Sequence, residues 1–136
     1  MGALGKPSAS EHVPETSSVV RWFEIPVLNM RRAVAFYDHV CSVKLEVTDS
    51  GEHAMAFFPH EPDEVGGALV AGPGCTPSDT GALIYLNAGE DLDAALARVE
   101  DAGGRVVLGR TALGDAGYFA LFLDTEGNKL AFHTTL

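Results

Sequence analysis

The stretch that decides the fold is EIPVLNMRRAVAFYDHV, residues 24–40, which sets the end of an apolar strand directly before an amphipathic helix. The strand starts upstream, because VVRWFEIPV (19–27) alternates an apolar face with a second face that carries Trp22 and Glu24. Asn29 is suited to cap a helix whose apolar side chains recur at three- and four-residue spacing. The stretch therefore predicts a strand followed by a helix with one face on a core.

The same pattern returns 62 residues later, where Asp91 stands in the place of Asn29 and caps a second apolar-striped helix. Three short strand patterns follow each helix, at 44–48, 53–58 and 66–71 and then at 105–110, 118–124 and 129–134. The sequence thus predicts one βαβββ module used twice. We expect an α+β domain over residues 19–136, made of module 19–72 and module 81–134.

Composition and charge limit the partners and the cellular location to be expected for this domain. Residues 1–18 are rich in Gly, Ser and Pro without a period, which predicts a flexible N-terminal leader. The net charge of −10 opposes binding to nucleic acid, and no apolar run is long enough to span a membrane. Cys41 and Cys75 lie outside any CxxC pattern, which favours reduced thiols. The expected location is the cytoplasm.

Three pieces together resemble the vicinal oxygen chelate superfamily, also called the glyoxalase, bleomycin resistance and extradiol dioxygenase group. They are EIPVLNMRRAVAFYDHV, DLDAALARVEDAGGRVV and GYFALFLDTEGNKLAFH, in the order and spacing of that family. The resemblance implies that the two modules form a curved mixed sheet around a cavity, with the helices on the outside. It also implies a homodimer, since small members of the family complete their cavities across chains.

Metal-using members of the family carry a His or Glu on the first and last strand of each module. Carried onto this chain, those positions fall on Trp22, Leu69, Leu83 and Ala131. None of these side chains offers a lone pair suited to a divalent cation. The sequence therefore departs from the family's metal-dependent pattern, which predicts no metal and no other cofactor and disfavours lactoylglutathione lyase and ring-cleaving dioxygenase activity.

A displacement by two residues along each strand brings in Glu24, Ala71, Tyr85 and His133 instead. Because Glu24 and His133 are ionisable, they are candidate acid-base catalysts or ligands of a weakly held divalent ion. The plainer alternatives stay open. Glu24 would be a carboxylate at the cavity rim, paired with Arg21, Arg110 or Lys129, and His133 an exposed histidine at the end of a strand.

Further residues are expected to line the cavity without taking part in chemistry. Trp22 and Tyr85 suit stacking against a flat or apolar ligand. The strand parity and the loop before residue 118 add the remaining candidates for ligand binding, which are Leu83, Asn87, Ala131 and Tyr118.

The sequence leaves two main functions open. The first is a metal-free protein that binds a small organic molecule, as the drug-resistance branch of the family does. The second is a glyoxalase-like lyase or isomerase that uses Glu24 and His133. A third possibility is an interaction module without a ligand. No P-loop, GxSxG or dinucleotide-binding pattern points to other chemistry.

Overall fold

The structure is a computed structural model, and it describes residues 18–136. The predicted leader, residues 1–18, lies almost wholly outside the described residues. The fold described below is therefore that of the two predicted modules.

Each module contains the predicted strand, helix and three further strands in the predicted order. The first module consists of β1 (Trp22–Pro26), α1 (Met30–Cys41), β2 (Glu46–Ser50), β3 (His53–Phe57) and β4 (Gly66–Ala71). The second consists of β5 (Tyr85–Asn87), α2 (Leu92–Asp101), β6 (Arg105–Ala112), the 3-10 turn η1 (Gly114–Ala116), β7 (Tyr118–Leu123) and β8 (Lys129–Thr134). The first strand of each module is shorter than predicted, since residues 19–21 and 81–84 stay outside the sheets.

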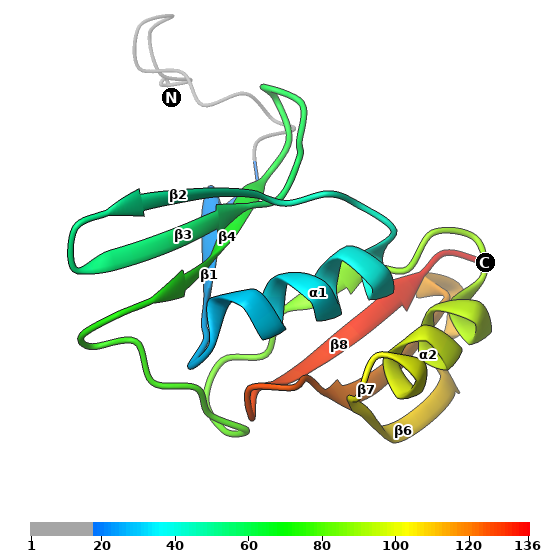
Figure 1. The fold of residues 1–136 in the computed structure, drawn as a ribbon. Helices are drawn as coiled ribbons and strands as arrows, with labels where there is room; N and C mark the ends of the chain where they lie inside the picture. Colours follow the sequence, from blue (N-terminus) through cyan, green and yellow to red (C-terminus); the bar gives the residue numbers. More distant parts are fainter. Residues whose placement is uncertain (1–17) are drawn as a thin grey trace, which may run out of the picture.

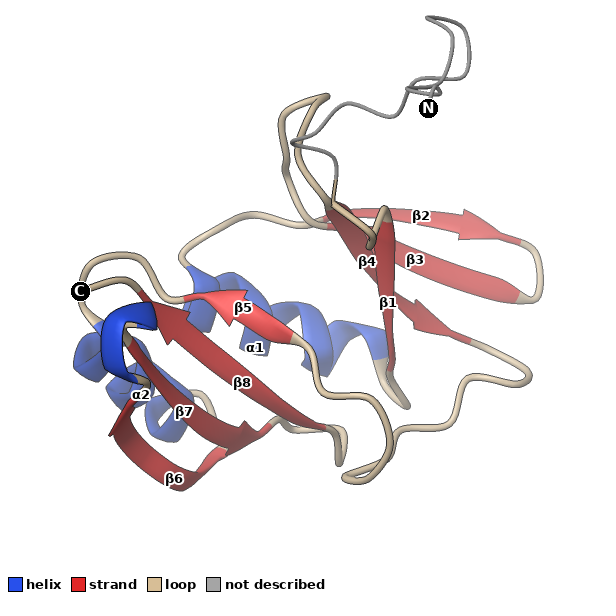
Figure 2. Ribbon diagram, turned by 180° about the vertical axis from the view of Figure 1, so that it is seen from behind, coloured by secondary structure: helices blue, strands red, loops and turns tan. Residues whose placement is uncertain are grey.

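The strands form two four-stranded mixed sheets, in the orders β1-β4-β3-β2 and β5-β8-β7-β6. In each sheet the first strand pairs in parallel with the last, and the remaining pairs are antiparallel. This arrangement confirms the α+β class and specifies it further, because the expected curved sheet is divided into two sheets (Figure 2). Pro26 lies on the free edge of β1, where its missing N–H costs no ladder bond.

Both helices begin as predicted and pack on one shared core. The side chains of Asn29 and Asp91 accept hydrogen bonds from the backbone three residues on, at 3.0 Å in each case. Figure 1 shows α1 lying across the centre of the molecule. Its Phe36 packs 6.2 Å, between ring centroids, from Phe122 of β7, and neither ring is more than 1% exposed. A helix of the first module thus contributes to the core of the second sheet.

Glu126, in the turn between β7 and β8, holds the two modules together. Its Oε1 accepts hydrogen bonds from the backbone N–H groups of Leu28 and Asn29, each at 2.9 Å, at the N-terminus of α1. The Nε of Arg32 donates to Glu126 Oε2 at 2.7 Å. Burial by itself raises the pKa of Glu126, but the hydrogen bonds from Arg32, Asn29, Thr125 and Leu28 outweigh it and hold the pKa at about 2.

The same turn makes two further buried contacts with the first module. Asp124 Oδ2 accepts a hydrogen bond of 2.6 Å from the hydroxyl of Tyr37, a fully buried residue of α1. Asn128 Nδ2 donates to the carbonyl oxygen of Pro26 at 2.8 Å. These contacts join residues about 90 to 100 positions apart and fix the edge of β1 relative to β8.

Replacement of the Glu126 carboxylate tests this link. Glu126→Ala leaves Arg32 and the N–H groups of Leu28 and Asn29, just before α1, without their acceptor. We expect the free energy of unfolding, measured by urea denaturation, to fall by about 3 kcal/mol. Arg31→Ala, at an exposed neighbouring position of α1, should leave the unfolding midpoint unchanged. Equal midpoints for the two variants would contradict the assignment.

The pH dependence of stability provides a second readout of the same variant. The folded-state pKa of Glu126 is lowered from 4.5 to about 2, so its deprotonated form favours folding. The stabilising contribution is complete above pH 4.5 and is lost as the pH falls from 4.5 toward 2. Glu126→Ala should therefore lose less stability than the wild type across this window.

Candidate functional site

The outer face of the first sheet, opposite the helices, carries the predicted site residues of β1. Phe23 and Ile25 face the core, while Trp22 and Glu24 are exposed, as the strand parity predicts. Glu24 is in register with Ala68 of β4, and Ala68 with Phe57 of β3, so all three lie on this outer face.

An aromatic cluster forms on this face around Trp22. Its ring centroid lies 6.1 Å from that of Phe57 and 6.1 Å from that of His60. The ring of His60 occupies the space above Gly66, where a Cβ would collide with it. Trp22 remains 40% exposed, so the cluster presents an aromatic surface to solvent.

Glu24 is held at the edge of the cluster by its neighbour. Its Oε2 accepts a hydrogen bond of 3.2 Å from Trp22 Nε1. Arg21, Arg110 and Lys129 were its expected partners, but within residues 18–136 no Lys or Arg lies within salt-bridge distance of this carboxylate. Glu24 is therefore an exposed acceptor beside an indole ring.

The second sheet has a corresponding outer face, which brings together four of the expected residues. Tyr85 and Asn87 of β5 are in register with Ala131 and His133 of β8. Phe119 of β7 adds a ring 6.2 Å from that of Tyr85. Tyr85, Asn87 and His133 line a groove of about 560 Å³ at the end of β5 and β8, to which Glu90 and Thr135 also contribute. Leu83 precedes β5 and is 36% exposed.

The two candidate catalytic groups lie apart. His133 Nε2 is 2.6 Å from the carbonyl oxygen of Ala116, which requires Nε2 to carry the proton in this contact. His133 lines the groove on the second sheet, whereas Glu24 lines a separate cleft. The structure therefore does not bring Glu24 and His133 into one pocket within the described part of the chain.

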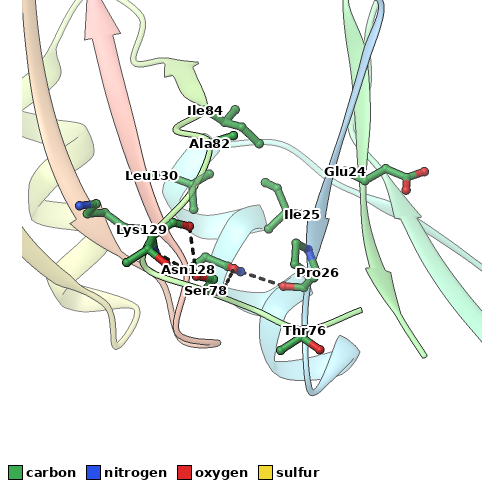
Figure 3. Close-up of a pocket in the computed structure, with 11 residues that line it drawn as sticks. Glu24, Ile25, Pro26, Thr76, Ser78, Ala82, Ile84, Asn128, Lys129 and Leu130 are labelled. Carbon is green, nitrogen blue, oxygen red and sulfur yellow. Dashed lines mark hydrogen bonds between the residues drawn. The ribbon is translucent and has the colours of Figure 1, made fainter. Parts of the chain in front are cut away.

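The cleft that Glu24 borders lies between the two sheets and has a volume of about 200 Å³. Figure 3 shows Ile25 and Leu130 facing each other across it, with the carboxylate of Glu24 turned away on the other side of β1. Ala82 and Ile84 add to this apolar part of the lining, and the remainder is polar, with Thr76, Ser78, Thr80, Asn128 and Lys129. The cleft is smaller than typical pockets for drug-sized ligands, which measure about 300–1,000 Å³.

Tyr118 lies on the other face of β7 from Phe119. It packs against the hydrophobic core, and the guanidinium carbon of Arg110 stands 4.3 Å above its ring. Arg110 also contacts Asp93 of α2, which fixes this side of the sheet as the helix side. Tyr118 is therefore not among the residues that line the groove or the cleft.

The structure corrects the predicted equivalence between the two last strands. The N–H of Val27 bonds to the carbonyl of Val70, and the N–H of Ala88 bonds to that of His133, each at 2.9 Å. His133 thus corresponds to Val70, not to Ala71 as predicted. Ala131 likewise corresponds to Ala68 and not to Leu69, so the prediction was wrong by one residue. Leu69 is in register with Ile25 and lies in the core.

The side chains at the corrected positions do not fit a divalent metal. They are the indole of Trp22, the methyl groups of Ala68 and Ala131, and the isobutyl group of Leu83, none of which is a metal ligand. In the displaced set, Val70 is no ligand either. Across residues 18–136, no three His, Cys, Asp or Glu side chains gather as a metal site would require.

Residues 19–132 match the Glyoxalase/Bleomycin resistance protein/Dioxygenase superfamily. The chain belongs to this superfamily. No curated protein matches the sequence. Among solved structures, glyoxalase I from Zea mays superposes with a TM-score of 0.66 at 18% identity, over 83% of this chain and 44% of the maize chain. The chain thus spans less than half of that superfamily member.

Two further superfamily structures are similar over most of their own length. TnmS3, an antibiotic-binding protein from Streptomyces, has a TM-score of 0.64 and 25% identity, over 90% of this chain and 100% of its own. Glyoxalase I from Leishmania major has a TM-score of 0.61 and 18% identity, over 87% of each chain. The glyoxalase structures therefore confirm the superfamily fold alone.

Sequence reasoning missed Phe57 and His60 as neighbours of Trp22. The alternation in HAMAFF could have placed Phe57 on the outer face, but its register against β4 has no local signal. His60 belongs to the PHEPDE loop, which resembles an ordinary solvated acidic segment. The ring of His60 can lie beside Trp22 because Gly66 has no side chain, and a Cβ at this position would collide with the ring.

Proposed function

We propose that this chain binds a small organic molecule in a cavity that does not use a metal. The observation that carries the proposal is the set of side chains where metal-using relatives place their ligands. In this chain those positions hold Trp22, Ala68, Leu83 and Ala131, which supply an aromatic and apolar surface. Such a surface favours stacking and burial of a flat ligand over polarisation of a bound oxygen.

Two structural features favour binding over catalysis. Glu24 and His133, the expected proton-transfer groups, line different pockets. The Nε2 of His133 is also engaged by the carbonyl of Ala116. A general base has to reach the proton that it removes, so this arrangement does not supply the acid-base pair of a lyase or isomerase.

The similarity to TnmS3 supports the same function. TnmS3 is an antibiotic-binding protein, and this chain covers its whole length. The lining that the two outer faces provide includes Trp22, Tyr85 and Phe119, which suits an aromatic or polycyclic ligand. Sequestration of such a ligand is the activity that we propose.

The setting proposed for this activity is the cytoplasm. Both cysteines are free thiols, and burial raises the pKa of Cys41 to about 12, which disfavours its reactive thiolate. Within the described residues, no helix has the length and apolar character needed to cross a membrane.

Binding of a neutral planar probe tests the proposed function. We expect 2-naphthol, added at about ten times its Kd, to raise the unfolding midpoint by roughly 4 °C. Trp22→Ala should weaken binding about tenfold, since it removes the stacking surface. Leu28→Ala removes another exposed apolar side chain away from both faces and should bind like the wild type.

Equal binding by the two variants would contradict a role for Trp22. The absence of binding by any planar probe would favour an interaction module.

We further propose that two copies of the chain complete the cavity. Each outer face is an open surface and holds only some of the expected residues, Trp22 and Glu24 on the first and Tyr85, Asn87, Ala131 and His133 on the second. The faces also differ in charge. The first face carries Glu24 and Glu46. The second face carries Arg105 and Lys129, which lie on either side of Leu123 and are both in register with it. A two-fold dimer that places the first face of one protomer over the second face of its partner pairs these charges.

Light scattering after gel filtration tests this assembly. The wild type should elute at twice the chain mass of 14.3 kDa. The double variant R105E/K129E should dissociate to monomers, and adding E24K and E46K should restore the dimer by reversing both charged patches. Arg31→Glu, at an exposed position of α1, is the matched control. A wild type that stays monomeric at high concentration would overturn the proposal.

A further inference from the structure

We infer that the outer face of the first sheet selects an organic cation, such as a quaternary or protonated amine attached to an aromatic body. This inference deepens the proposed function and rests on it, because it names the chemical class of the ligand. It depends on two properties of the face, the aromatic cluster and the distribution of charge.

The aromatic cluster has the geometry that a cation requires. The hydrogen bond from Trp22 Nε1 to Glu24 fixes the edge of the indole ring against a carboxylate. The indole is 40% exposed, and the rings of Phe57 and His60 lie 6.1 Å from it. The negative face of an indole attracts a cation placed above it, and Trp is the strongest of the aromatic side chains in this respect.

The strands of this sheet place carboxylates on this face and no Lys or Arg side chain that could neutralise them. Glu24 lies beside Trp22, and Glu46 of β2 is in register with Phe57, so carboxylates stand on both sides of the cluster. None of the four strands of this sheet contains Lys or Arg. The protein as a whole has a net charge of −10, which adds to the attraction of cations from solution.

These properties discriminate between ligands of different charge. A cation above the indole of Trp22 lies close to the carboxylate of Glu24, so ring and carboxylate attract it together. A neutral ligand of the same shape would cover the carboxylate without replacing its hydration. An anion would be repelled by both carboxylates. The face therefore favours a positively charged ligand over its neutral and negative counterparts.

Fluorescence titration with three single-ring probes tests the inference. Trp22 is the only tryptophan of the chain, so its emission reports on this site alone. The probes are benzyltrimethylammonium, benzyl alcohol and benzenesulfonate, which share a ring and differ in charge. We expect benzyltrimethylammonium to bind at least about tenfold more tightly than benzenesulfonate, and salt to weaken its binding.

Charge-neutralising variants locate the effect. Glu24→Gln and Glu46→Gln should each weaken binding of benzyltrimethylammonium about threefold. Glu52→Gln removes the same charge from the exposed turn between β2 and β3 and should change binding little. Trp22→Phe should weaken binding further, as measured by calorimetry, because a phenyl ring attracts cations less than an indole.

The outcomes separate this inference from the proposed function. If benzyl alcohol or benzenesulfonate binds as tightly as the cation, or if Glu24→Gln behaves like Glu52→Gln, cation selection is overturned and ligand binding stands. If 2-naphthol binds and benzyltrimethylammonium does not, the inference alone fails. If neither binds, the proposed function fails as well.

Discussion

The buried carboxylate of Glu126 is the contact on which the arrangement of the two modules depends. It accepts hydrogen bonds from the backbone just before α1, although it comes from the other half of the chain, and it also accepts a charge-assisted bond from Arg32. Because α1 packs on both sheets, its position fixes the cleft between β1 and β8. The sheets themselves share no hydrogen-bonded strands in the described residues, so this turn substitutes for strand pairing across the modules.

Separation of the sheets has a functional consequence. The outer faces point away from the common core and carry different chemistry, one aromatic and acidic, the other aromatic with basic residues at one end. A duplicated module has thus given two surfaces that are no longer equivalent. This difference supports the pairing of two copies, and the carboxylates of the first face, where they are not paired with a partner, support its proposed preference for a cationic ligand.

The sequence predicted the elements more successfully than their register. Two signals for the helices are local in the sequence, the N-caps Asn29 and Asp91 and the apolar residues at three- and four-residue spacing. Both helices begin where these signals place them. Placement of Leu69 required the pairing of β4 with β1, which depends on the whole sheet, and a shift of one residue moved it from the outer face to the core. His60 and Phe57 escaped prediction for the same reason, since tertiary contacts bring them to Trp22.

We propose that an aromatic and apolar surface binds the ligand at the positions where related proteins hold a metal. Calorimetric titration of nickel, zinc and manganese into protein purified without chelators tests it most directly. We expect no stoichiometric binding at neutral pH, because Trp22, Ala68, Leu83 and Ala131 provide no ligand atoms. Binding of one ion per chain that is lost in both Glu24→Ala and His133→Ala would show instead that the chain holds a metal through these two residues.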